Sequence, residues 1–364
     1  MSPRGTGDTH HEPWLDAVRV LACLLVIVIH SPLIRNGQGS FWLSAFNYLA
    51  SPCIGLFFMI SGATLLPIRV STRLFLRSRF GRIVPPLVTW SILYLGVAVL
   101  YAETSPGNAL AAALRIPLAA VGNDAFWFLY SLLGLYLFLP FLSPWIAGAT
   151  PAMLRLYLGA WVLALGVPYA DALLPGVSQA LATPDGLLAN FQGYAGYAVA
   201  GFYLRKYPPD HATSLLTPRR AIPFTLVSVV IPVLFYLGVF RGLENRVLYG
   251  YLTANVALLA VGLFCIMQRG APHLVQWKTP LQQVGGDTFG IYLVHLMILR
   301  RVVQPIIIAH GPEFPLLQIP ATAAATFLLS LCLVELIRML PGFLPYLLLG
   351  TDESSHPAGT FGGG

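Results

Sequence analysis

Charged residues are scarce in this sequence. Only 10% of its 364 residues are Asp, Glu, Lys or Arg, whereas 57% are hydrophobic, and the mean hydropathy is +0.73. Soluble domains carry about 25% charged residues, so the composition excludes an ordinary soluble protein. No stretch between the apolar runs is long enough for a soluble domain. We therefore expect the chain to be embedded in a lipid bilayer.

Cysteine is also rare, and no pair of cysteines has the spacing of a metal or redox site. The sequence has four, Cys23, Cys53, Cys265 and Cys332, and all lie within apolar runs. We interpret them as small core residues and expect no bound metal. The sequence shows no internal repeat of fixed period and no heptad seam, which argues against a solenoid or a coiled coil.

Apolar runs long enough to cross a hydrocarbon core of ~30 Å recur along most of the chain. The run from 21 to 29 lacks the two-residue alternation of a barrel strand, so we expect helices. The sequence predicts an all-α, polytopic membrane helical bundle with about ten transmembrane helices. A cytoplasmic leader (1–13) precedes the transmembrane domain (14–348), and a disordered cytoplasmic tail (349–364) follows it. The ten predicted spans are 15–34, 47–67, 83–101, 126–146, 152–170, 189–204, 221–240, 246–267, 287–308 and 317–340.

The positions of the basic residues predict an orientation. If the amino terminus is cytoplasmic, most arginines and lysines fall in inner loops, as the positive-inside rule requires, and both termini are cytoplasmic. Five arginines cluster in the loop region between the second and third spans: Arg69, Arg73, Arg77, Arg79 and Arg82. The net charge of +7 is then explained by topology, and we expect no nucleic-acid partner.

The first predicted span carries two ionisable groups, Arg19 and His30. Charged side chains are costly in a membrane, so such residues are functional candidates. Eleven positions make three helical turns plus about 20°, which places both residues on one stripe, ~16 Å apart along the axis. Arg19 lies near the cytoplasmic surface with Asp16 as a possible partner, and His30 lies toward the outer side. An interfacial anchor and a packed histidine are the competing interpretations.

Several segments of the chain carry motifs in a consistent order. The arginine and histidine of the first span are followed by FFMISG at 57–62, RFGRIVP at 79–85, FWFLY at 126–130 and FGIYLVH at 289–295. Together they resemble the acyltransferase 3 family of membrane O-acyltransferases, nearest the subgroup that contains the enterobacterial common antigen O-acetyltransferase. That subgroup usually has HLWFL where this sequence has AFWFL at 125–129. The role of the missing histidine is absent or has shifted to Asp124.

The resemblance implies an acyl-coenzyme A donor, with acetyl-coenzyme A expected, and an acceptor hydroxyl on a glycan or lipid-linked sugar. His30 would act as a general base or form an acyl-histidine, with Arg19 and Asp16 beside it. Guanidinium groups suit phosphates, so the five loop arginines are the candidates for coenzyme A binding. Arg79 and Arg82 match the family motif. For the other three, determination of topology is the alternative.

Other candidates would bind the acceptor on the outer side of a bacterial cytoplasmic membrane. They are Asp124, Trp127, Tyr130, Tyr292, His295, Arg300 and Arg301. Aromatic residues are also common packing and interface residues in membrane helices, and His295 has a structural hydrogen bond as its alternative. A transporter or exporter of a polysaccharide or glycolipid is the competing function, because carriers also have many spans with intramembrane charges.

Overall fold

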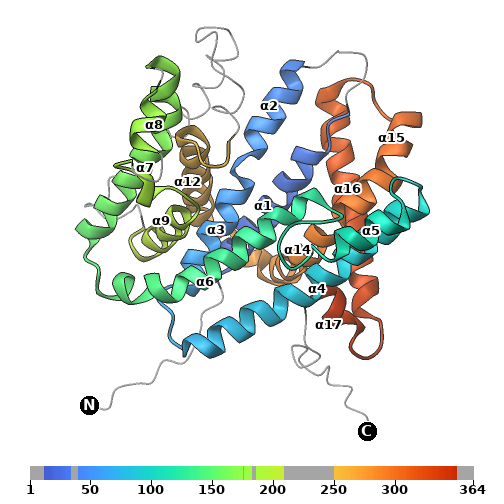
Figure 1. Cartoon of the computed structure of the whole chain (residues 1–364), viewed down its shortest axis with the longest axis horizontal. Coiled ribbons are helices and arrows are strands. Elements are labelled where there is room, and N and C mark those ends of the chain that lie inside the picture. Colours follow the sequence, from blue (N-terminus) through green and yellow to red (C-terminus); the bar gives the residue numbers. More distant parts are fainter. Residues whose placement is uncertain (1–11, 34–39, 175, 183–185, 209–249, 351–364) are drawn as a thin grey trace.

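The structure is a computed structural model that describes residues 12–33, 40–174, 176–182, 186–208 and 250–350. Within these ranges every regular element is a helix, which confirms the prediction of an all-α bundle. Figure 1 shows α1 (Pro13–His30), α3 (Pro52–Leu65) and α14 (Lys278–Ile298) near the middle of the bundle. On one side lies α7 (Pro151–Leu173), and on the other lie α15 (Gln304–His310) and α16 (Pro315–Arg338).

Seven stretches in the described part of the chain are long and apolar enough to cross a membrane. Each corresponds to one of the ten predicted spans, which confirms a polytopic membrane bundle. The seven are Pro13–His30, Trp42–Leu65, Thr72–Leu100, Asp124–Gly148, Pro151–Ala170, Ala271–His310 and Pro315–Arg338.

The remaining three predicted spans differ from that pattern. The stretch predicted at 189–204 overlaps α9 (Ala195–Lys206), whose 12 residues extend only ~18 Å and follow a loop in which Gly193 has a φ of 105°. The stretch predicted at 246–267 overlaps α12 (Ala254–Arg269), of 16 residues. The span predicted at 221–240 lies outside the described residues. So do residues 1–11 and 351–364, which make up most of the predicted leader and tail.

Proline and hydroxyl residues mark where the long helices begin. Ser71 precedes α4 (Thr72–Leu100), and its side chain accepts a hydrogen bond from the Leu74 amide at 3.4 Å. Thr150 caps α7 in the same way. The second stretch is two helices, α2 (Ser40–Ala50) and α3, with Pro52 at the start of α3. Proline is tolerated in a first helical turn because the amide there has no partner within the helix.

A very close helix crossing joins α3 to α9. A Cβ atom on Gly62 would lie 1.8 Å from the Ala198 carbonyl oxygen, and one on Gly201 would lie 1.9 Å from the Met59 carbonyl oxygen. Small residues at such crossings let the two backbones approach, which is how membrane helices gain packing contacts. This contact fixes the position of α3, which lines the site described below.

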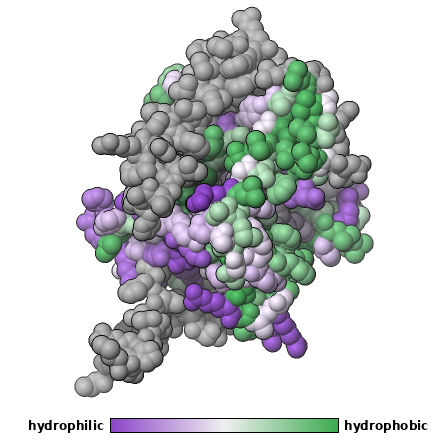
Figure 2. All heavy atoms as spheres, turned by 90° about the vertical axis from the view of Figure 1, so that its left-hand side faces the viewer, coloured by the Kyte–Doolittle hydropathy of each residue, from purple (hydrophilic) through white to green (hydrophobic). Residues whose placement is uncertain are grey.

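The exterior of the bundle exposes large apolar side chains. Phe141 is 80% exposed and Leu156 is 76% exposed, on α6 (Trp127–Gly148) and α7 respectively. Figure 2 shows broad hydrophobic areas on one face of the molecule. Such surfaces are unfavourable in water, so they agree with a lipid-facing exterior.

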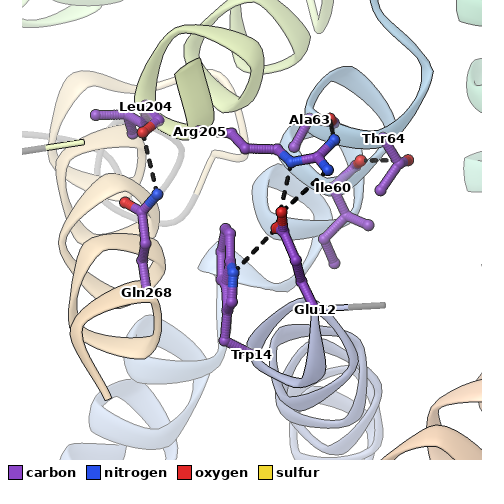
Figure 3. A network of polar contacts seen from close by, with 8 residues as sticks. All are labelled: Glu12, Trp14, Ile60, Ala63, Thr64, Leu204, Arg205 and Gln268. Carbon is purple, nitrogen blue, oxygen red and sulfur yellow. Dashed lines mark hydrogen bonds and ion pairs between the residues drawn. The ribbon is translucent and has the colours of Figure 1, made fainter. Parts of the chain in front are cut away.

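A polar network ties four helices together where α1 begins (Figure 3). Glu12 accepts hydrogen bonds from the Trp14 indole at 3.1 Å and from two guanidinium nitrogens of Arg205 at 3.1 and 3.2 Å. Arg205, on α9, also donates to the Ala63 carbonyl of α3, and Gln268 of α12 donates to the Leu204 carbonyl. We call this the arginine end of the bundle. It contains the start of α1, the start of α4 and the ends of α3 and α9.

Candidate active site

A cavity of about 440 Å³ lies among α1, α3, α4, α6 and α14. Four charged residues line it, namely Asp16, Arg19, Arg79 and Arg82. They come from the first two turns of α1 and the first half of α4, so the charges gather toward the arginine end. The uncharged polar residues that line it are Ser61, Thr64, Tyr136, Gln282, Thr288 and Tyr292. The cavity can therefore accept a ligand that has both anionic and apolar parts.

Arg19 reaches the cavity from a fixed position on α1. Its guanidinium donates to the carboxylate of Asp16, one turn earlier, as their spacing predicted. Asp16 is buried against Gly285 of α14, where a Cβ atom would lie 2.9 Å from the Asp16 Cβ. The Arg19 side chain is 33% exposed. The pair therefore presents a partly exposed cation to the cavity, with a buried counter-charge one turn earlier on the same helix.

Arg79 and Arg82 lie three residues apart on α4, a spacing that places two side chains on the same face of a helix. In the part of the chain that the structure describes, neither has a carboxylate partner. The Arg79 guanidinium lies over the Phe75 ring, 5.8 Å from its centre, and its buried Nε atom has no hydrogen bond to any residue that the structure describes. The charges of Arg19, Arg79 and Arg338 all act on Arg82. Cations gathered in this way favour a polyanionic ligand.

The five loop arginines proposed from the sequence separate into two groups. Arg79 and Arg82 line the cavity, whereas Arg69, Arg73 and Arg77 do not. Arg69 precedes α4, which begins at Thr72, and Arg73 and Arg77 lie on α4 nearer its start than the cavity. Only the later pair is placed to contact a ligand inside the bundle.

A second, smaller cavity of about 40 Å³ contains His30, the last residue of α1. Its other lining residues include Trp127, Tyr251 and Cys53. The Trp127 and Tyr251 rings stack with centroids 5.4 Å apart. The chamber is thus aromatic and narrow, with one imidazole exposed to it. It lies toward the opposite end of α1 from Asp16.

Phe128 and Tyr292 line both cavities. Their rings are 5.6 Å apart in an edge-to-face arrangement, and the Tyr292 hydroxyl donates to the Ala125 carbonyl. We call these two residues the aromatic wall. Because each of them borders both cavities, the wall is where a ligand in the large cavity comes nearest to the His30 chamber.

His30 lies beside a second histidine, His295 of α14. The centres of the two rings are 5.5 Å apart. His295 is fully buried, and its Nδ1 atom lies 2.6 Å from the Tyr292 carbonyl oxygen. The charges of Arg300 and Asp124 also act on His30. The structure therefore brings His30, Tyr292, His295 and Trp127 to one place.

Four of the predicted acceptor-binding residues line neither of the two cavities. The Tyr130 hydroxyl donates to the Ile116 carbonyl, and neither cavity includes this residue. Arg301 pairs with Glu103 at 2.6 Å and lies 4.2 Å from the centre of the Tyr101 ring. Asp124 is exposed at the start of the short helix η1 (Asp124–Phe126). Arg300 is exposed in the π-helical segment η4 (Leu299–Val303).

Sequence reasoning did not select several residues of the two cavities. Phe128 lies within the FWFLY motif, but the motif gave no reason to choose it over its neighbours. Nothing in the sequence pointed to Gln282 or Tyr251 as site residues, because single glutamines and tyrosines are common in apolar stretches. Their part in the site depends on contacts between distant helices.

The fold and the site together define a polytopic membrane protein with an internal two-cavity site, charged at one end and holding a histidine at the other. The comparison with protein families is more specific. The sequence model of the acyltransferase 3 family, described as an acyltransferase domain, matches residues 12–335. The chain therefore belongs to the acyltransferase 3 family, and it is a membrane acyltransferase. No curated protein and no solved structure was found to match it.

Proposed function

We propose that this protein transfers an acetyl group from acetyl-coenzyme A to a hydroxyl group of a glycan or glycolipid. The proposed location is the bacterial cytoplasmic membrane, with both termini in the cytoplasm. The sequence motifs resemble those of the subgroup of the enterobacterial common antigen O-acetyltransferase, apart from Ala125 in place of its usual histidine, and this likeness supports a cell-envelope sugar as acceptor.

One observation supports this function best: the arginine-lined cavity and the His30 chamber share the aromatic wall. Coenzyme A carries phosphates at one end and the acyl thioester at the other. Arg79 and Arg82 have the chemistry to hold the phosphates, because guanidinium groups bind phosphate oxygens in pairs. The thioester arm would then extend along α1 toward His30, ~16 Å beyond Arg19 along the helix axis.

The size of the His30 chamber supports acetyl over longer acyl groups. Its volume is about 40 Å³, and Trp127, Phe128 and Tyr292 contribute rings to its lining. The small volume and the surrounding rings suit a short acyl group better than a long one.

His30 would act as the general base. The acceptor hydroxyl gives its proton to the imidazole as its oxygen attacks the thioester carbonyl. The carbon–sulfur bond then breaks, the ester forms, and the coenzyme A thiolate takes the proton back from the imidazolium. Such assistance is typically worth ~10²- to 10⁴-fold in rate.

The test is release of free thiol from acetyl-coenzyme A by the purified protein in detergent with a bacterial glycolipid extract. We expect the wild type to release thiol and His30→Ala to lose at least ~10²-fold of the rate. His273→Ala, at an exposed histidine of α13 (Ala271–Leu274), is the control and should keep wild-type activity.

Two results would contradict the proposal. A wild-type protein that binds the glycolipid but consumes no thioester would favour the transporter. Full activity in a correctly folded His30→Ala protein would remove His30 from the chemistry, either as base or as acylated nucleophile.

A further inference from the structure

His295 has an unused hydrogen-bonding atom next to His30. The side chain is fully buried, and its Nε2 atom has no hydrogen-bond partner among the described residues. A buried polar atom without a partner is costly, and such exceptions concentrate where a function requires them. The nearby His30 ring, 5.5 Å away between centres, is a candidate partner.

The contact of the other ring nitrogen determines which proton His295 carries. Nδ1 lies 2.6 Å from the Tyr292 carbonyl oxygen, and a carbonyl oxygen can only accept. Nδ1 must therefore be the protonated nitrogen. In a neutral imidazole the second nitrogen then holds a lone pair, so Nε2 is an acceptor.

We propose that His295 is a positioning residue that sets the tautomer of His30 by accepting a hydrogen bond from it. A bond of about 3 Å between two imidazole nitrogens puts the ring centres about 5 Å apart, close to the distance observed. Hydrogen bonds in catalytic sites are often long before substrate binds and shorten afterwards. This inference rests on the proposed function of His30 as the base.

The arrangement has a direct consequence for the proton transfer. When one His30 nitrogen donates to His295, the other must carry the lone pair, and it can face the chamber. The acceptor proton moves to that nitrogen, and the resulting imidazolium keeps its N–H bond to His295 Nε2. The leaving thiolate later removes the added proton, which restores the starting tautomer. His295 itself gains and loses no proton.

Two substitutions separate this role from a structural one. In His295→Gln the side-chain oxygen can lie near the position of Nε2, so the acceptor for His30 remains. In His295→Asn the side-chain amide can replace Nδ1 and donate to the Tyr292 carbonyl, but the acceptor is lost. A purely structural histidine, needed only for its bond to Tyr292, would tolerate Asn better than Gln.

The experiment measures kcat and KM for thiol release by both variants and the wild type, after size-exclusion chromatography and thermal unfolding establish that they are folded. We expect kcat within about tenfold of wild type for Gln and reduced ~10²-fold or more for Asn, with KM for acetyl-coenzyme A little changed in either. The reverse order, or equal loss in both, overturns the inference.

A spectroscopic measurement on the wild type does not depend on either variant folding. Nitrogen-15 spectra of histidine-labelled protein should show His295 with a protonated Nδ1 and an unprotonated Nε2, and the His295 signal can be assigned by labelling valine and histidine together, because Val294–His295 is the only Val–His pair in the sequence. A protonated Nε2 would overturn the inference. An inactive wild type would instead contradict the proposed function, so the two failures can be told apart.

Discussion

Arg79 and Arg82 differ from the other arginines of the α3–α4 region in one measurable way, since they alone among the five line the large cavity. We expect Arg79→Ala and Arg82→Ala each to raise the KM for acetyl-coenzyme A about tenfold or more, with a smaller effect on kcat. Phosphate contacts that are made equally in the ground state and the transition state have this signature. Steady-state thiol release at varied donor concentration measures both constants.

Arg73→Ala is the matched control for this pair. Arg73 is exposed in the first turn of α4 and does not line the cavity, so its removal takes away a cation from the same helix without removing a cavity contact. Its KM should stay within about twofold of the wild type. If all three variants raise the KM for acetyl-coenzyme A equally, the arginine cluster acts through general electrostatic attraction. Salt screens such attraction over ~8 to 10 Å.

At the residue scale, the sequence predicted contacts that lie along one helix and missed those between helices. The Asp16–Arg19 contact follows from their spacing by one turn. By contrast, the Tyr130 hydroxyl donates a hydrogen bond to the Ile116 carbonyl. Arg301 donates one to Glu103, which is 198 positions away in sequence. No local pattern carries that information, because it depends on where the preceding loop and helix lie.

Among the helices, the α3–α9 crossing makes the sharpest prediction about stability. A methyl group on Gly201 would lie 1.9 Å from the Met59 carbonyl oxygen, so Gly201→Ala must push the two helices apart. Overpacking of this kind typically costs ~1 to 3 kcal/mol. We expect the thermal unfolding midpoint in detergent to fall by several degrees.

Gly159→Ala tests whether that effect belongs to the crossing. Gly159 lies on α7, where a Cβ atom would have no neighbouring atom within 4 Å, and alanine favours a helix over glycine by up to ~1 kcal/mol. Its unfolding midpoint should be unchanged or slightly raised. If the unfolding midpoint falls equally in both variants, the close approach of α3 and α9 is not the cause of the lost stability.

The existence of the helices was predictable from hydropathy, whereas their breaks and lengths were less so. The sequence predicted one span at 47–67, but α2 and α3 are separate helices with Pro52 at the start of α3. It also predicted a span at 189–204, where α9 is too short to cross a bilayer alone. Hydropathy shows only that these segments are apolar. It does not distinguish a helix that faces lipid from a short one enclosed by protein.

For the molecule as a whole, the two cavities predict that donor and acceptor bind from opposite sides. The charged residues lie where α1 and α4 begin, and His30 lies at the far end of α1. In vesicles of known orientation, acetyl-coenzyme A supplied only at the arginine end should acetylate an impermeant glycan on the other side. The product is measured after the vesicles are separated from the donor.

The control is to supply donor and acceptor together on either side. If product forms only when both are on one side, the acyl group does not cross the bundle. The assignment as an acyltransferase does not depend on this result. The orientation was predicted from arginine positions alone, and its measurement by protease access to the α3–α4 loop is independent of catalysis.

The aromatic wall also bears on permeability. A protein that opens toward both aqueous compartments through one continuous channel would conduct ions, and each elementary charge that crosses 100 mV dissipates ~2.3 kcal/mol. Here Phe128 and Tyr292 border both cavities, and the Tyr292 hydroxyl is held by the Ala125 carbonyl. The aromatic rings therefore stand between the two cavities. In the proposed mechanism an acyl group would pass this point while the membrane keeps its electrical insulation.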